Sequence, residues 1–210
     1  MGTPSRSLAG AACAVWLGLA CGCGVRNSLR IDPSGNLADG PRGPTAVLSV
    51  LARPDHGPRT RGMTLGIVDT PNAEERFAEL LAHAAAEDGG MQALPPYEVQ
   101  KRLRKAKLEP TLEPRPEEVE QFAAALGLAS YLTAEVTQWR FKYLLFSSSA
   151  VVEFSVRCHQ VPDGRVVWQA HVLKQAGATS DREAARQALF EMFRQLRGTG
   201  AAPAPLPSTG

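Results

Sequence analysis

The sequence predicts a single α/β (α+β) domain in which a mixed β-sheet of about four to five strands carries three to four helices. Two stretches, 131–141 and 150–161, alternate apolar and polar residues as half-buried strands do. Other stretches place apolar residues three and four positions apart, which is the period of an amphipathic helix. Helical and strand-forming stretches alternate along the chain, and the last strands follow one another directly. We therefore expect a mixed sheet with helices packed on it.

The first 20 residues have the organisation of a bacterial signal peptide. A short polar start containing Arg6 precedes an apolar run, 8–20, that carries no charge. A spanning helix needs roughly 20 apolar residues, so this shorter run is typical of a signal-peptide core. The small residues before Cys21 resemble a lipobox, in which the cysteine is acylated and becomes the new N-terminus. Cys23, preceded by Gly22, is the alternative lipidation site.

A lipobox implies a membrane anchor made of acyl chains and a place in the cell envelope. No Asp follows either cysteine, which in Gram-negative bacteria favours an outer-membrane lipoprotein facing the periplasm. Two other interpretations stay open, a plain secretory signal with incidental cysteines and a buried hydrophobic segment.

Residues 21–62 are expected to form a linker rich in Gly and Pro. From Pro33 to Gly62, ten of thirty residues are Gly or Pro, which disfavours regular structure. One apolar patch, 46–51, interrupts the stretch and fits an edge strand docked on the domain.

The ordered domain is expected over 63–197, followed by a disordered Ala/Pro-rich tail at 198–210. The predicted order is β-α-β-α-α-β-β-β-α. Helix starts are indicated by Thr70-Pro71, by Pro116 with acidic residues after it, and by Ser180 with Glu183 as a capping box. The predicted elements are a strand at 64–68, a helix from Thr70-Pro71 to Gly89-Gly90, a short strand at 91–94, a basic helix at 95–107, a helix at 116–126, strands at 131–141, 150–161 and 165–173, and a helix from 180 to 196.

Alternation assigns faces to the strands. Leu132, Ala134 and Val136 share one face, while Thr133, Glu135, Thr137 and Trp139 share the other. Cys158 falls on the face of Val152, Phe154 and Val156, which predicts a buried free thiol, with a disulfide to the linker as the alternative. Pro162-Asp163-Gly164 indicates a hairpin turn.

No motif of catalysis, cofactor binding or metal binding is present, and we therefore expect no enzyme. Phosphate-binding glycine loops, GxSxG, HExxH and CxxC are all missing. His159 and His171 lie on neighbouring predicted strands and could approach each other, but no third metal ligand is evident. The formal net charge of +2 and the lack of a long basic run argue against nucleic acid as a partner.

Two segments are candidates for contact with a partner. The first alternates aromatic and basic residues into an apolar tip, which fits either sheet packing or an exposed loop that meets a protein or a membrane. Its residues are Trp139, Phe141, Tyr143, Leu144, Leu145 and Phe146. The second is the basic helix, either a solvated face or a site for an anionic partner, with Lys101, Arg102, Arg104, Lys105 and Lys107.

The domain resembles the CsgG/LpoB/PelC-type envelope lipoproteins, whose fold is related to the N-terminal domain of TolB. A helix ends in the phrase LGLASYLTAEV at 126–136, and a strand pair closes with DGRVVW at 163–168. The resemblance covers roughly 63–197 and rests on structural motifs. It implies non-enzymatic work in secretion, polysaccharide export or cell-wall synthase regulation, with an envelope protein as partner and self-association as a further option. The stretch 142–149 is too short for the membrane-crossing hairpins of the channel-forming members.

Two other hypotheses remain. One is an enzyme whose site is dispersed along the chain, and the other is a passive structural surface lipoprotein.

Overall fold

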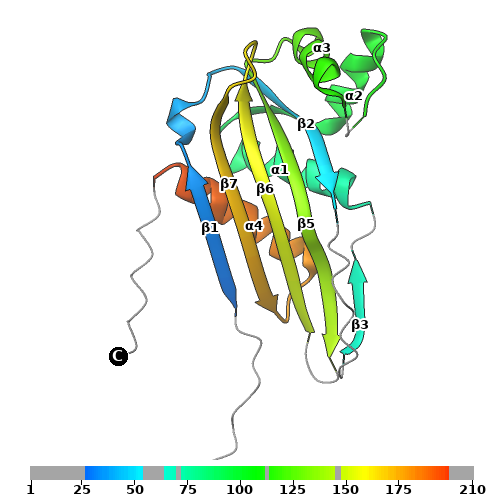
Figure 1. Ribbon diagram of the computed structural model, residues 1–210, viewed down its shortest axis with the longest axis vertical. Coiled ribbons are helices and arrows are strands. Elements are labelled where there is room, and N and C mark those ends of the chain that lie inside the picture. The colour runs from blue at the N-terminus through cyan, green and yellow to red at the C-terminus, as the bar shows by residue number, and fades with distance from the viewer. Residues whose placement is uncertain (1–26, 54–63, 70–71, 112–113, 145–147, 199–210) are drawn as a thin grey trace, which may run out of the picture.

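The computed structural model describes residues 27–53, 64–69, 72–111, 114–144 and 148–198. Within them lie seven strands and four α-helices (Figure 1). The strands are β1 Ser28–Ser34, β2 Pro44–Ala52, β3 Thr64–Asp69, β4 Gln92–Leu94, β5 Ser130–Leu144, β6 Ser148–Gln160 and β7 Val166–Gly177. The helices are α1 Ala73–Glu87, α2 Pro96–Lys105, α3 Pro116–Leu126 and α4 Asp181–Leu196, with a short 3₁₀ turn, η1, at Leu37–Asp39.

The strands form one mixed sheet in the order β1-β7-β6-β5-β2-β4, and β3 pairs with the second half of β5. The β2 strand runs parallel to both β5 and β4, whereas β1, β3, β5, β6 and β7 form antiparallel pairs. The predicted mixed sheet with helices packed on it is confirmed. From Thr64 onward the order of elements is also the predicted one.

The structure differs from the prediction in residues 28–52, which were expected to belong to the linker apart from a docked edge strand at 46–51. They contribute β1 and β2, so the sheet has seven strands and the domain begins before Met63. Pro33 is compatible with β1 because β1 is an edge strand, and Pro44 is the first residue of β2. Gly35 lies in a turn with φ of 84°, where a Cβ would come within 2.6 Å of the Val167 carbonyl oxygen. Pro33 and Pro44 thus lie within β1 and β2, and Gly35 lies in the connection between these two strands, which pair with other strands of the sheet.

Helices α1 and α4 cover one face of the sheet and enclose the main core, as Figure 1 shows behind the strands. Its fully buried aromatic side chains include Phe77, Phe154, Trp168 and Phe193. Helices α2 and α3 pack together near the start of β2 and cover a second, smaller cluster, which we call the satellite core. It consists of Ala46, Leu48, Val99, Leu103, Phe122, Ala123, Leu126 and Leu128.

The helix starts follow the sequence signals in two of three cases. Ser180 Oγ accepts a hydrogen bond from the Glu183 amide at 3.1 Å, which caps α4 as predicted. Pro116 is the first residue of α3, also as predicted. Helix α1 instead begins at Ala73 after Asn72, and the expected cap at 70–71 lies outside the described residues.

A β-bulge in β5 places Trp139 on the core face, contrary to the predicted alternation. Val136 pairs with Phe154, but the register shifts so that Gln138 pairs with Glu153 and Trp139 with Val152. One extra residue in a strand moves all following side chains to the opposite face. The Trp139 side chain is accordingly buried, and its indole Nε1 donates to the Asp181 carbonyl at 3.1 Å.

Candidate functional site

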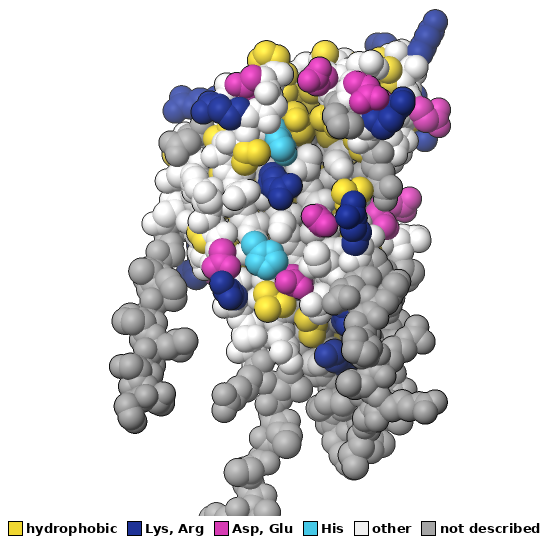
Figure 2. Space-filling model, in the orientation of Figure 1, with side chains coloured by type: hydrophobic (Ala, Val, Ile, Leu, Met, Phe, Trp, Pro, Cys, Tyr) yellow, Lys and Arg dark blue, Asp and Glu magenta, His cyan; other side chains and the backbone are white. Residues whose placement is uncertain are grey.

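The face of the sheet opposite α1 and α4 carries a polar network on β5, β6 and β7. Glu153 accepts a hydrogen bond from Gln138 Nε2 at 2.7 Å, and His171 Nε2 lies 3.4 Å from its other carboxylate oxygen. The second ring nitrogen of His171 lies 3.1 Å from Ser155 Oγ. Figure 2 shows this face, with histidine side chains among acidic and basic ones. The network fixes the orientation of these side chains on an open surface.

A serine, a histidine and a carboxylate in series also occur in hydrolases, but the setting of Ser155 differs. Nucleophilic catalysis needs a pocket for the substrate and donors aimed at a developing oxyanion. Three cavities lined by described residues do not include Ser155, His171 or Glu153 in their walls.

The two strand histidines do not meet. His171 lies opposite Ser155, whereas His159 lies opposite Val166, four positions farther along β6 and so about 13 Å away. His159 stacks on Tyr131 with ring centroids 4.7 Å apart, and its Nε2 lies 3.0 Å from Thr133 Oγ1. Among the described residues, no group of three or more His, Cys, Asp or Glu side chains is placed to hold a metal ion.

Cys158 is the buried free thiol that the alternation of β6 predicts. Its side chain is fully buried in the main core, and it forms no disulfide. Burial raises the pKa of the Cys158 thiol to about 11, although a contact with Ser130 acts in the opposite direction. The thiol is therefore neutral at physiological pH and serves as a packing group.

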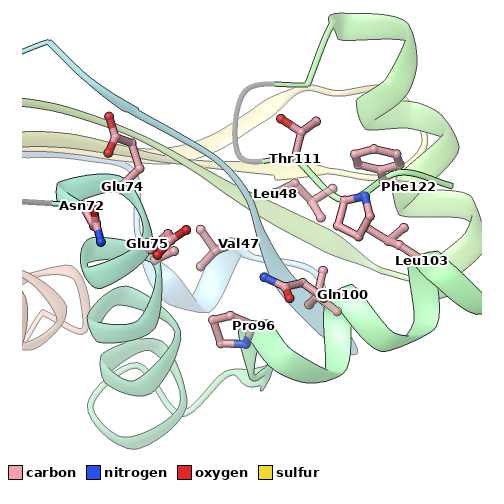
Figure 3. Close-up of a pocket in the computed structure, with 13 residues that line it drawn as sticks. Val47, Leu48, Asn72, Glu74, Glu75, Pro96, Gln100, Leu103, Thr111 and Phe122 are labelled. Carbon is pink, nitrogen blue, oxygen red and sulfur yellow. The ribbon is translucent and has the colours of Figure 1, made fainter.

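A cavity of about 390 Å³, which we call the lateral groove, opens between β2, α1, α2 and α3. Figure 3 shows Glu75 and Gln100 approaching Val47 from opposite walls. Glu74 and Asn72 stand at the α1 end. The apolar lining consists of Val47, Leu48, Ala78, Pro96, Val99, Leu103, Pro110 and Phe122. The groove is thus apolar inside and acidic at one rim.

The groove forms where side chains of β2 pack in both the main core and the satellite core. A register shift between Val47 and Ser49 lets Leu48 pack in the satellite core, while Val47 and Val50 pack in the main core. In addition, β4 pairs only with residues 44–46 of β2. Beyond Ala46, the outer edge of β2 has no strand partner among the described residues. The sequence signal for this edge was the apolar patch 46–51, interrupted only by Ser49, whose side chains pack in both cores.

The predicted contact segment is divided by the structure. Trp139 is buried, and Phe141 is half-buried against the main core. Tyr143 and Leu144 form the end of β5, while Leu145 and Phe146 lie outside the described residues. Ser28, where the described chain enters the sheet, aligns through Gln175 and Val151 with Arg140. The start of β1 therefore lies at the same end of the sheet as the end of β5 and the start of β6 (Figure 1).

The candidate lipidation sites, Cys21 and Cys23, lie outside the described residues. None of the helices in the described ranges is long and apolar enough to cross a membrane.

The fold and its surfaces define an α/β domain of the predicted class, whose candidate sites are exposed faces. No protein-family model matches the chain, and no curated protein matches it. Solved structures do. PelC from Paraburkholderia phytofirmans, a dodecamer, is similar with a TM-score of 0.54 and 18% identity in its L103M form, over 82% of this chain and 99% of that one. A second PelC dodecamer structure from the same organism gives 0.53 and 14%, over 81% and 98%.

Lipoprotein GNA1162 from Neisseria meningitidis follows with a TM-score of 0.48 and 14% identity, over 74% of this chain and 99% of that one. The likeness to PelC confirms the fold that the resemblance in the sequence predicts.

Proposed function

We propose that this protein is a lipid-anchored accessory protein of the bacterial cell envelope that acts by protein–protein interaction and assembles with copies of itself. The observation that carries the proposal is the likeness to PelC, a dodecamer whose chain is covered almost completely. A fold shared over its whole length offers the same kind of flanks for assembly. The candidate surfaces of the described chain, an open polar face and a lateral groove, suit such a role.

The anchor in this proposal is an acylated Cys21, with Cys23 as the alternative. Acyl chains hold the protein at the membrane because each buried methylene contributes about 0.8 kcal/mol. The chain enters the sheet at the end where β5 turns into β6. That end would face the membrane, and Phe141, Tyr143, Leu144, Leu145 and Phe146 would meet lipid or a membrane-bound partner there.

The proposal extends to the place and the task of the protein in the envelope. An outer-membrane lipoprotein facing the periplasm could support secretion, polysaccharide export or the regulation of a wall synthase. We favour a non-enzymatic role because the Ser155–His171–Glu153 series lies on an open face.

The test is the mass of the detergent-solubilised protein, measured by size-exclusion chromatography with light scattering. We expect a defined oligomer of many copies, and mass spectrometry should find the acyl chains on the N-terminal cysteine. Cys21→Ser should abolish acylation, while Cys23→Ser is the matched control. A single-chain mass at micromolar protein concentration would contradict self-assembly, and a processed N-terminus without lipid would contradict the anchor.

A further inference from the structure

We infer that the lateral groove binds an extended, basic segment of a partner protein, which adds as a strand to the outer edge of β2. The inference rests on the proposed action by protein–protein interaction and names the chemistry of the partner. The side chains of the bound segment alternate, with a Lys or Arg facing α1 and apolar side chains facing α2 and α3.

Strand β2 presents a row of backbone groups along the groove. On one side it pairs with β5 from Thr45 to Ala52, whereas on the other side β4 pairs only with Pro44 to Ala46. Within the described ranges, the outer edge of β2 from Val47 onward therefore has no strand partner. The N–H and C=O groups of such an edge are a template for a further strand, and many peptides are recognised by strand addition.

The two walls of the groove lie over opposite faces of β2. Val47 packs in the main core with α1, and the next residue, Leu48, packs in the satellite core with α2 and α3. Figure 3 shows Glu75 of α1 and Gln100 of α2 approaching Val47 from the two sides. Successive side chains of a strand point to opposite faces of its sheet. A strand beside β2 would therefore direct one set of side chains to α1 and the other set to α2 and α3.

The α1 wall selects a cation. Glu75 is exposed and Glu74 half-buried, and neither forms an ion pair with any described residue. No Lys, Arg or His belongs to the described residues that line the groove. A Lys or Arg of the bound segment would thus meet unpaired carboxylates, whereas an acidic segment would be repelled.

The opposite wall selects apolar side chains. Its lining from α2 and α3 consists of Pro96, Val99, Leu103 and Phe122, with the amide of Gln100 at the rim. The groove has a volume of about 390 Å³, within the range of pockets that enclose a ligand. Apolar pockets beside an open strand edge give specificity, while the backbone hydrogen bonds give affinity.

A designed peptide tests the site in the full lipidated chain, solubilised in detergent. The probe is the fluorescein-labelled peptide Gly-Ser-Val-Lys-Leu-Ser-Val-Gly, in which polar and apolar side chains alternate, and a second peptide has Glu in place of Lys. Fluorescence polarisation should show at least about tenfold tighter binding of the Lys peptide than of the Glu peptide.

Glu75→Lys should reverse this preference for the Lys peptide. Glu79→Lys is the matched control and should keep it, because Glu79 is exposed on the same helix but does not line the groove. Equal urea midpoints should show that both variants are folded.

Backbone methylation tests the addition of a strand. Adjacent amides of a strand point to opposite sides, so N-methylation at the Lys or at the Leu of the probe blocks only one of its two edges. One of these peptides should bind like the parent peptide, and the other at least about tenfold more weakly. Equal binding of both would show that the peptide does not pair with β2.

The outcomes separate this site from the proposed function. A Lys peptide that binds no more tightly than the Glu peptide, or an equal loss in Glu75→Lys and Glu79→Lys, would overturn the site. A Glu75→Lys protein that fails to assemble but binds both peptides like wild type would assign the groove to a second copy, and so overturn it too. The oligomer mass and the acylated N-terminus are measured on the same preparation, so a failure of self-assembly or of lipidation is distinguishable from a failure of peptide binding.

Discussion

The main core and the satellite core differ in size and in closure, although they share strand β2. The main core holds 29 buried residues between the sheet and helices α1 and α4, against eight in the satellite core under α2 and α3. Ala46 and Leu48 serve the satellite core, whereas Val47 and Val50 serve the main one. Because buried apolar area dominates folding free energy, the main core should determine global stability.

The comparison explains where binding surfaces arise. The main core is enclosed between one face of the sheet and helices α1 and α4. The other face of β5, β6 and β7 carries polar side chains and is open. The satellite core is smaller and does not fill the space between α1 and the α2–α3 pair. The lateral groove lies in that space. Exposed apolar area of this kind marks sites of interaction.

The largest expected effect comes from the centre of the main core. Phe154 is fully buried and lies 4.8 Å from Phe77, centroid to centroid. Phe154→Ala should lower the free energy of unfolding by about 4 kcal/mol, because it removes a large side chain that the core cannot replace. Urea denaturation followed by circular dichroism measures this. Tyr97→Ala, at a residue 71% exposed, is the control and should stay within about 0.5 kcal/mol of wild type.

A smaller effect is expected in the satellite core. Leu103 is 2% exposed but borders the groove, where the structure can relax around a shortened side chain. Leu103→Ala should cost about 3 kcal/mol. Hydrogen exchange should show faster opening of α2 and α3 in this variant, with the β6 amides still protected. Equal loss of protection in β6 and α2 would mean that the two cores unfold as one unit.

The third effect depends on pH and concerns Cys158, which is fully buried in the main core. Its pKa is raised by burial to about 11 in the folded chain from 9.0. The unfolded chain therefore loses this proton first as pH rises. Stability from the neutral thiol is complete below pH 9 and is lost as pH rises toward 11.

The expected loss is about 2 kcal/mol. Other groups also titrate in this range, so the measured quantity is the difference between wild type and Cys158→Ala. If both proteins lose stability in parallel between pH 9 and pH 11, the thiol is not responsible.

The sequence predicts what depends on local periodicity and caps. The elements from Thr64 onward, the α4 cap at Ser180 and the burial of Cys158 all follow from spacing of three, four or two residues. In 28–52, β1 was missed because Gly and Pro density predicts irregular structure, whereas β2 was anticipated as a docked strand at 46–51 but placed at an edge of the sheet. A count of Gly and Pro cannot distinguish a linker from strands that contain Pro at their edges and Gly in the connection between them.

Long-range features were not predictable in the same way. The face of Trp139 depends on a bulge after Val136, which leaves no mark in composition. The groove combines Val47, Glu75 and Gln100, which come from three segments brought together only by the fold. Only the apolar run around Leu48, facing two cores at once, gave a local hint of it.

The smallest expected effect on the free energy of unfolding comes from surface carboxylates, one on a helix of each core. On α4, the Arg186 and Gln187 side chains lower the pKa of Glu183 to about 2. On α2, Arg102 similarly lowers the pKa of Glu98. For Glu183, the lowered folded pKa means that the stabilisation is present above pH 4.5 and is lost as pH falls through about 2. Both carboxylates are near the surface, so solvent screens most of the effect.

Glu183→Gln should therefore lower the free energy of unfolding at pH 7 by roughly a few tenths of a kcal/mol, and flatten its decline in acid. Glu98→Gln should leave the global urea midpoint unchanged, since α2 belongs to the core that contributes less. Parallel urea titrations at pH 7, pH 4 and pH 2 measure both variants. If Glu98→Gln moved the urea midpoint more than Glu183→Gln, the satellite core would determine global unfolding. A change on α2 can shift the global midpoint only if α2 unfolds together with the rest of the domain.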